Sequence, residues 1–154
     1  MSSVSKNTIL FLATSGFAGY IRVAPGTFGT LTGIPLAYLI GISGLHLGFM
    51  LLLIVITLSV MVAERAKGYF QREDPPEIVC DEVAGFCVAV FGLTPDWTNL
   101  ILGFILFRFF DILKPFPIRT VERRLSGGAG IVADDLVAGV YANVLLNIIT
   151  VVRG

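Results

Sequence analysis

Two apolar stretches without a charged residue constrain this chain most. Residues 28–44 and 47–63 each contain 17 residues and no Asp, Glu, Lys or Arg. A helix needs about 17–25 apolar residues to cross a bilayer, so each stretch meets the lower limit. Gly41, Ser43 and Gly44 lie between them and are typical turn residues. The pattern predicts a helical hairpin in a membrane.

The composition also favours a membrane protein. Apolar residues make up 55% and charged residues 14% of the chain, against about 45–50% and about 25% in soluble domains. So few charges exclude a solvated disordered chain. The balance of 11 basic and 11 acidic residues argues against non-specific nucleic-acid binding. A very apolar soluble oligomer is the alternative. We expect one domain, residues 1–154, with no nucleic-acid partner, and no protein partner is predicted.

The second half of the chain is apolar in shorter pieces. Apolar runs cover residues 83–93, 100–107 and 136–152. No period-2 alternation typical of strands appears. We therefore expect an all-α fold, a small multi-helix bundle embedded in the membrane with about four to five apolar helices. Residues 8–20 are apolar but short, and we expect them to lie at the membrane interface or partly inside it.

Basic residues set the expected orientation. They gather in two predicted loops, 64–77 and 114–130, whereas the turns at 41–46 and 92–98 contain none. The basic residues of the two loops are Arg65, Lys67, Arg72, Lys114, Arg119, Arg123 and Arg124. Because short basic loops stay on the cytoplasmic side, we expect this end of the bundle to face the cytoplasm.

Five carboxylates fall at the same end of the predicted bundle. Asp81 and Glu82 begin one helix, and Asp111 ends its hairpin partner. Asp134 and Asp135 begin the last helix. Ionisable residues beside apolar spans are costly and indicate a functional site. Because oxygen ligands suit Mg²⁺ or Mn²⁺ rather than zinc, these carboxylates are candidate ligands of one or two Mg²⁺ ions.

Each carboxylate also has a structural interpretation. An acidic residue at a helix start interacts favourably with the macrodipole, by about 0.3–1 kcal/mol, and this would explain four of the five. Asp111 lies near a helix end instead, where an ion pair with Arg108, three residues earlier, is the alternative. Gly85 and Gly139 each follow a carboxylate by four residues. They permit close helix approach, which would bring the carboxylates together.

Groups suited to phosphate lie near the carboxylates in the predicted topology. The stretch PGTFGT at residues 25–30 offers backbone N–H groups and two hydroxyls at a helix start, which favours anion binding. Lys114 and Arg119 flank two prolines and would bind phosphate or anchor at anionic headgroups. Neither Cys80 nor Cys87 has an Arg six residues later, so the Cys-x5-Arg loop of cysteine-dependent phosphatases is absent. The two cysteines form no CxxC motif either, and we expect them to be buried thiols.

Two other classes of function compete with an enzyme. A small cation transporter would use the carboxylates to line a permeation path. It is disfavoured because the two strong apolar stretches contain no ionisable residue and the carboxylates gather at one end. A non-enzymatic assembly subunit leaves that gathering unexplained.

Four blocks of sequence carry a family resemblance. They are RVAPGTFGT (22–30), CDEVAGF (80–86), FRFFDILKPFPIR (107–119) and GGAGIVADDLVAGVYAN (127–143). Together they resemble the phosphatidylglycerophosphatase A family of bacterial membrane phosphatases. The resemblance implies Mg²⁺-dependent hydrolysis of phosphatidylglycerophosphate to phosphatidylglycerol and inorganic phosphate. It also implies a multi-pass protein of the bacterial cytoplasmic (inner) membrane, with its active site facing the cytoplasm.

The resemblance marks the matching positions, and the chemistry of the residues there suggests candidates for three roles. The metal ligands are Asp81, Glu82, Asp111, Asp134 and Asp135. The catalytic residues are Asp134, Asp135, Asp111, Lys114 and Arg119, with Asp134 or Asp135 as the general base. The substrate-binding residues are Gly26, Thr27, Gly29, Thr30 and Arg108.

Overall fold

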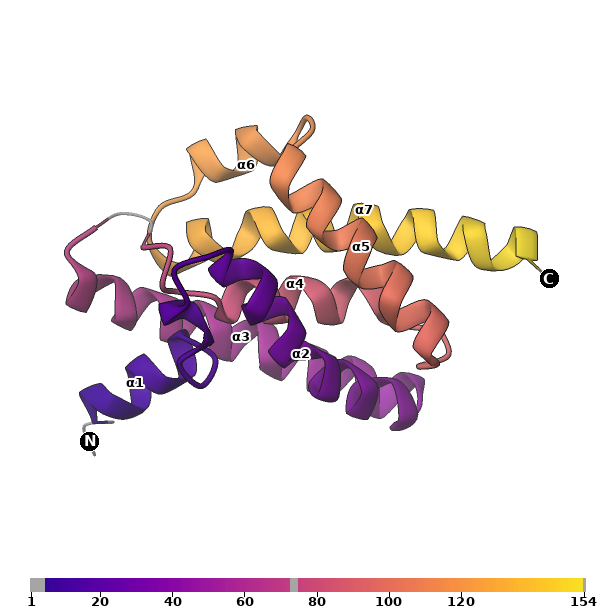
Figure 1. The fold of residues 1–154 in the computed structure, drawn as a ribbon, viewed down its shortest axis with the longest axis horizontal. Coiled ribbons are helices and arrows are strands. Elements are labelled where there is room, and N and C mark those ends of the chain that lie inside the picture. The colour runs from indigo at the N-terminus through magenta and orange to yellow at the C-terminus, as the bar shows by residue number, and fades with distance from the viewer. Residues whose placement is uncertain (1–4, 73–74, 154) are drawn as a thin grey trace.

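The computed structural model describes residues 5–72 and 75–153, with the side chains of residues 122 and 123 left out. The described chain forms only helices, which confirms the predicted all-α class (Figure 1). In chain order they are α1 (Lys6–Ala13), the short 3-10 helix η1 (Ala18–Tyr20), α2 (Pro25–Ile42), α3 (Leu45–Phe70), α4 (Cys80–Val90), α5 (Trp97–Leu113), α6 (Ile118–Arg124) and α7 (Gly127–Arg153).

The short helix α4 lies at the centre of the bundle. It packs against α2, α3, α5 and α7, and most of its residues are buried. A Cβ atom on Gly85 would lie 2.7 Å from the carbonyl oxygen of Asp135, and one on Gly139 would contact the carbonyl oxygen of Gly85. The two glycines therefore allow the backbones of α4 and α7 to touch, as their spacing predicted.

The C-terminal end of α4 is fixed by a side chain of α7. The amide of Asn143 donates to the carbonyl oxygens of Val88, Ala89 and Phe91 at 3.1, 3.1 and 2.9 Å. A helix end leaves such carbonyl groups without intrahelical partners. The two N–H bonds of the Asn143 amide are shared among these three carbonyl oxygens, so α7 holds α4 at both its glycine contact and its end.

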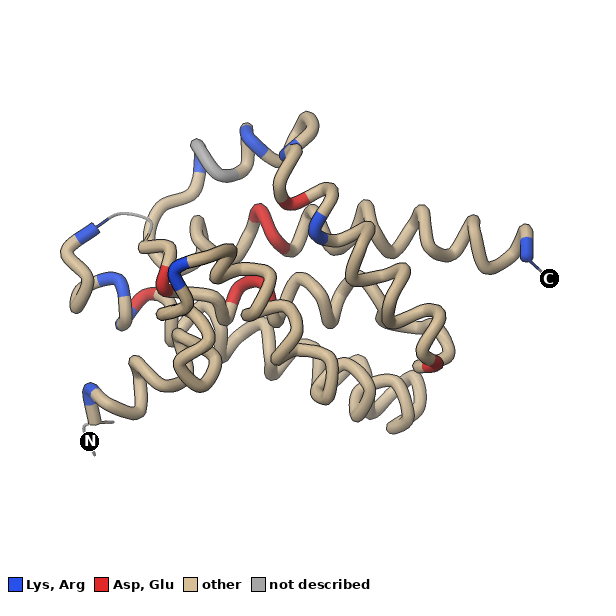
Figure 2. Tube along the Cα trace, viewed as in Figure 1, with Lys and Arg blue, Asp and Glu red and all other residues tan. Residues whose placement is uncertain are grey.

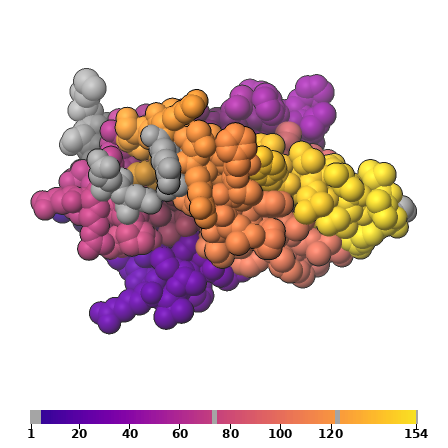
Figure 3. Space-filling model, turned by 90° about the horizontal axis from the view of Figure 1, so that it is seen from above, coloured from indigo at the N-terminus to yellow at the C-terminus, as the bar shows by residue number. Residues whose placement is uncertain are grey.

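Two of the described helices are long and apolar enough to cross a membrane, α3 and α7, fewer than the four to five predicted. Only 17% and 28% of their apolar windows are buried, so most of each surface faces outward. The last turns of α7 project beyond the other helices (Figure 3). α4 has 11 residues, or about 16 Å of helix against a hydrocarbon core of about 30 Å. α1, with 8 residues, is also too short to span.

Two predicted helix boundaries are wrong, and the predicted loop 114–130 contains the short helix α6. The charged stretch predicted as a loop at 64–77 is helical up to Phe70, because Ala63 and Ala66 face the core while the charged residues between them stay exposed. The last helix begins at Gly127, not at Asp134. The Asp134–Asp135 pair therefore lies two turns inside α7, beyond the first turn in which the macrodipole stabilises an acid.

The charges divide the molecule into two ends (Figure 2). The turn between α2 and α3 and the turn between α4 and α5 lie together at one end, as a Cβ on Gly41 would lie 2.7 Å from Pro95. At that end, the charged residues of the described chain are Asp96, in the turn between α4 and α5, and Arg153, in the last turn of α7. The other end carries the remaining acids and bases, as the sequence predicted.

Candidate active site

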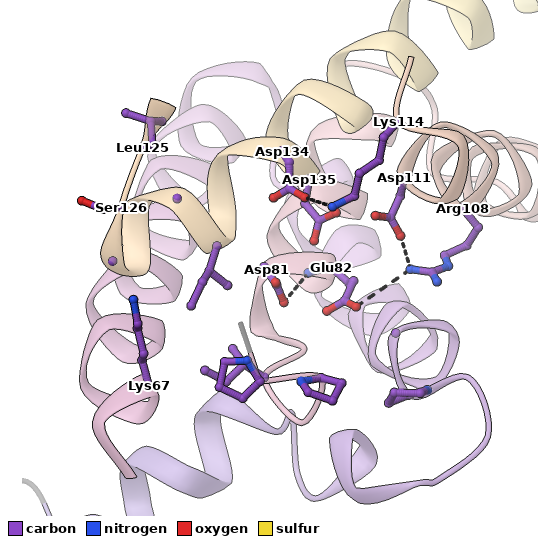
Figure 4. Close-up of a pocket in the computed structure, with 18 of the residues that line it drawn as sticks. Lys67, Asp81, Glu82, Arg108, Asp111, Lys114, Leu125, Ser126, Asp134 and Asp135 are labelled. Carbon is purple, nitrogen blue, oxygen red and sulfur yellow. Dashed lines mark hydrogen bonds and ion pairs between the residues drawn. The ribbon is translucent and has the colours of Figure 1, made fainter. Parts of the chain in front are cut away.

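A cavity of about 640 Å³ opens at the charged end of the bundle (Figure 4). It is enclosed by the first turn of α2, the last turns of α3 and α5, the start of α4 and the first turns of α7. Its charged lining residues are Lys67, Asp81, Glu82, Arg108, Asp111, Lys114, Asp134 and Asp135. All five predicted carboxylates therefore meet in one cavity, although they come from three separate helices.

Three of the carboxylates form a compact group. Asp81, Glu82 and Asp135 each offer an oxygen, and these atoms all lie within 4.8 Å of one another. Asp81 and Asp135 are buried, with 8% and 3% of their surfaces exposed. The backbone contact at Gly85 and Gly139, one turn further along each helix, brings α4 and α7 close enough for this meeting.

Burial dominates the electrostatics of this carboxylate group. It raises the pKa of Asp81 well above the usual 3.8, and the charge of Glu82 raises it further. Burial also raises the pKa of Glu82. The Oε2 atom of Glu82 is buried without a hydrogen-bond partner in the described part of the chain. Buried oxygen donors that lack compensation fit a hard divalent cation such as Mg²⁺.

The other two carboxylates are paired with cations. Lys114 Nζ lies 2.7 Å from Asp134 Oδ2. Arg108 pairs with Asp111 in the i,i+3 manner predicted as the structural alternative, and its Nη1 atom also lies 4.0 Å from Glu82 Oε1. Both cations still line the cavity. The site thus combines a group of three carboxylates with two ion pairs beside it.

The backbone at Lys114 directs its side chain into the site. Lys114 ends α5 with a φ of 44°, a left-handed conformation that is uncommon for residues other than glycine. The chain turns there into Pro115, and the ammonium group reaches Asp134 on α7. Residues held in this backbone region concentrate at functional sites.

The remaining predicted residues lie in different places. The PGTFGT stretch is the first turn and a half of α2, and Gly26 is the one of its four candidates among the described cavity-lining residues. A Cβ at Gly26 would contact Glu82 and Arg108. The Thr30 hydroxyl donates to the carbonyl oxygen of Gly26 at 2.8 Å, inside the helix. Arg119 is exposed, donates to a main-chain carbonyl at 3.4 Å, and does not line the cavity.

Thr27 and Gly29 also stay outside the cavity lining of the described chain. Gly29 packs against Val79, whose Cβ would lie 2.6 Å from an added Cβ. Gly29 therefore permits close packing of α2 on the segment that leads into α4. No contact of Thr27 with the cavity supports its predicted role.

Sequence reasoning missed Lys67 as a site residue. The sequence pattern marked it only as a basic residue of a loop predicted at 64–77. Its signal was the helical spacing of Ala63, Ala66 and Phe70, which keeps the helix intact and turns Lys67 toward the cavity. Glu64 was missed for the same reason, and its carboxylate accepts a hydrogen bond from the Gly128 N–H at the start of α7.

Comparisons with known proteins agree with the resemblance of the sequence blocks. Residues 11–150 match the family profile described as Phosphatidylglycerophosphatase A. A protein of that name from Haemophilus influenzae is 34% identical over 142 residues, covering 91% of this chain and 87% of its own. The protein of that name from Escherichia coli is 35% identical over 132 residues, covering 85% and 77%.

A third relative carries a different name. A Bacteroides thetaiotaomicron protein, provisionally named a phosphatidylinositol-3-phosphatase, is 33% identical over 144 residues, covering 88% of this chain and 89% of its own. No solved structure matches this chain. The profile match covers every residue of the cavity and two relatives share its name, so the chain belongs to the phosphatidylglycerophosphatase A family.

Proposed function

We propose that this protein is a single-domain, Mg²⁺-dependent membrane phosphatase. It hydrolyses the terminal phosphomonoester of phosphatidylglycerophosphate to phosphatidylglycerol and inorganic phosphate. Family membership and the names of two relatives support the reaction. The observation that carries the proposal is the group formed by Asp81, Glu82 and Asp135 in a cavity that Arg108 and Lys114 also line. Oxygen ligands beside cations suit the handling of phosphate by a metal ion.

In this proposal Asp81, Glu82 and Asp135 hold the metal. Mg²⁺, when bound there, supplies neutralisation of the phosphate oxygens and activation of the attacking water. The unpartnered Oε2 of Glu82 and the raised pKa of Asp81 both support a cation at this place, because a cation would offset the mutual repulsion of the carboxylates.

Asp134 and Lys114 act on protons and charge. Asp134 lines the cavity next to the metal group and accepts the proton of the water that attacks phosphorus. As the new P–O bond forms, the bond from phosphorus to the glycerol oxygen breaks, and that oxygen takes the proton to become the hydroxyl of phosphatidylglycerol. Lys114 and Arg108 stabilise the negative charge on the phosphate oxygens.

The site faces the cytoplasm in this proposal. The apolar helices α3 and α7 suggest membrane association. Arg65, Lys67 and Arg72 at the cavity end of α3 contrast with the turns at the opposite end, which carry no Lys or Arg. The positive-inside tendency then places the cavity on the cytoplasmic side of a bacterial inner membrane.

The direct test measures phosphate release from phosphatidylglycerophosphate in detergent micelles, with Mg²⁺ or with EDTA. The wild type, Asp134→Asn and Asp135→Asn are compared. We expect release that requires Mg²⁺ and is lost in both variants. Activity that survives EDTA, or full activity in both variants, would exclude the proposed chemistry.

The name of the third relative suggests a separate test of which lipid phosphate is the preferred substrate. Phosphatidylinositol 3-phosphate is assayed beside phosphatidylglycerophosphate, since a relative at 33% identity is provisionally named for a phosphoinositide. We expect a higher kcat/KM for phosphatidylglycerophosphate. The reverse ranking would keep the lipid phosphatase chemistry and replace the substrate.

A further inference from the structure

Lys67 occupies a wall of the cavity away from the other cations. It lies in the last turns of α3, is half-buried, and directs its side chain into the cavity (Figure 4). The carboxylates of α4 and α7 lie across the cavity from it, and Arg108 and Lys114 lie on their far side. Lys67 is therefore separate from the ion pairs of the site.

The cations of the cavity differ in their partners. Arg108 pairs with Asp111 and Glu82, and Lys114 pairs with Asp134. Within the described part of the chain, Lys67 makes no ion pair. A half-buried ammonium group that faces a cavity without a carboxylate partner is suited to an anionic ligand.

The position of Lys67 along α3 separates it from the carboxylate group. The hydroxyl of Ser59 donates to the carbonyl oxygen of Cys80 at 3.0 Å, so this turn of α3 lies level with the start of α4. Lys67 follows Ser59 by eight residues, which is about 12 Å along the helix at a rise of 1.5 Å per residue. Its flexible four-carbon stem covers part of this length. The cavity thus has a carboxylate part and a Lys67 part.

We propose that Lys67 binds a phosphate group at a second position in the cavity, separate from the position at Asp81, Glu82 and Asp135 where the phosphomonoester reacts. This inference rests on the proposed function, because that reaction offers two sources for such a group. One is the phosphodiester that joins the headgroup to the lipid. The other is the inorganic phosphate that hydrolysis releases.

The two sources can be distinguished experimentally, because each product of the reaction carries one of the two candidate groups. Phosphatidylglycerol carries only the phosphodiester, and inorganic phosphate carries only the released group. The experiment measures kcat and KM for phosphatidylglycerophosphate, and the inhibition constant of each product, for the wild type, Lys67→Gln and Lys67→Arg. Arg65→Gln is the matched control, because Arg65 is on the same helix, exposed, and not among the described lining residues.

We expect Lys67→Gln to keep kcat within about twofold of the wild-type value. The inhibition constant of one product should rise by about 10- to 100-fold, the scale of a hydrogen bond to a charged group. A parallel rise in KM and in the inhibition constant of phosphatidylglycerol assigns the phosphodiester. A rise for inorganic phosphate alone assigns the released group. Lys67→Arg should restore most of the affinity for that product. Arg65→Gln should leave KM and both inhibition constants unchanged.

Two results would overturn the inference while leaving the proposed function intact. One is active Lys67→Gln protein with unchanged constants for the substrate and both products. The other is a fall in kcat with unchanged binding constants, which would place Lys67 at the reacting phosphate or in a structural role. Wild-type protein that releases no phosphate would instead refute the proposed function, on which the inference depends.

Discussion

Acidic residues begin a helix at each end of this molecule, yet their surroundings are opposite. At the far end, exposed Asp96 caps α5 by accepting hydrogen bonds from the Asn99 N–H and the Thr94 hydroxyl, both at 2.9 Å. These bonds, that of the Asn99 N–H above all, lower the pKa of Asp96. At the cavity end, Asp81 and Glu82 open α4 in a buried site, and burial raises the pKa of each.

The difference teaches how to separate a capping acid from a site acid. Both fit the favourable interaction of a carboxylate with a helix N-terminus. At the cap, hydrogen-bond donors lower the pKa of the acid, whereas at the cavity burial outweighs the donors present, and Glu82 retains a buried oxygen without a partner in the described chain. Because an uncompensated buried charge destabilises the fold, its presence at the cavity end is best explained by a ligand that binds there.

The largest expected effect comes from removing one charge of the buried group. Asp81→Asn should lower kcat by about 10²–10³-fold, the scale for one electrostatic contact to a transition state. Asp96→Ala should leave kcat unchanged and lower Tm, because it removes the side chain that caps α5. Phosphate release and thermal unfolding in EDTA measure the two properties for both variants.

The stability of the same variants sharpens this comparison. Asp81→Asn keeps the acceptor of the Glu82 N–H, which lies 3.1 Å from Asp81 Oδ1, and removes repulsion from Glu82. In EDTA its Tm should equal or exceed that of the wild type. A large loss of Tm together with the loss of activity would show that Asp81 is a structural residue, like the cap.

A smaller effect should distinguish two cations that the sequence treated alike. Lys114 lines the cavity and pairs with Asp134, whereas Arg119 is exposed and outside the lining. Lys114→Gln should lower kcat/KM by about 10- to 100-fold, as expected for a charged group that contacts phosphate. Arg119→Gln should stay within about twofold, because it removes only an exposed charge. Equal losses would restore the sequence prediction for Arg119.

Much of the fold could be predicted because charges are scarce. The turn expected near 41–46 is the turn between α2 and α3, and it lies beside the turn that follows α4. That hairpin arrangement is what brings the carboxylates to one end. The end of α3 could not be read in the same way, since the exposed charged residues Glu64 and Arg65 lie between Ala63 and Ala66, two small residues of the buried helix face.

Within the site, the sequence predicted which carboxylates meet, but not which of them form the group of three and which pair with cations. All five line one cavity. The division into a group of three and two ion pairs depends on tertiary features: the left-handed turn at Lys114 and the reach of Arg108 toward Glu82. Residue spacing carries no information on either. The roles assigned to the individual residues stay predictions, which the variants above test.

The next largest effect is expected on stability, from a substitution at the close contact between α4 and α7. Gly85→Ala would place a methyl group 2.7 Å from the Asp135 carbonyl oxygen and 2.6 Å from the Phe107 ring. Such overpacking costs about 1–3 kcal/mol. Gly68→Ala is the matched control, since nothing lies within 4 Å of its added Cβ. That variant should gain about 0.4–1 kcal/mol by restricting the unfolded chain.

Chemical denaturation in detergent measures both glycine variants. If Gly85→Ala were as stable as the wild type, α4 and α7 would not need their close contact, and the carboxylates would meet for another reason. Activity adds a second measure, because a shift of α4 against α7 would also separate Asp81 from Asp135.

The smallest expected effect is the pH dependence of stability, where the two ends should differ in sign. The pKa of Asp81 is raised, so between 3.8 and the raised value the folded state holds a proton that the unfolded chain has released. Raising the pH through this window therefore lowers the free energy of unfolding in EDTA. Asp96, with its lowered pKa, contributes the opposite slope, at more acidic pH.

Mg²⁺ should cancel the cavity-end slope and leave the far-end slope unchanged, because a cation favours the ionised form of the buried group. Tm is measured with Mg²⁺ and with EDTA between about pH 3 and pH 8, a range that includes the acidic window of Asp96. The stabilisation by Mg²⁺ should grow toward the alkaline side by a few degrees, since about 1 kcal/mol corresponds to about 2–4 °C in a domain of this size. Asp81→Asn should flatten the EDTA curve. A Mg²⁺ effect that is independent of pH in the wild type would mean that the ion binds away from the buried carboxylates, and the contrast between the two ends would then be one of packing alone.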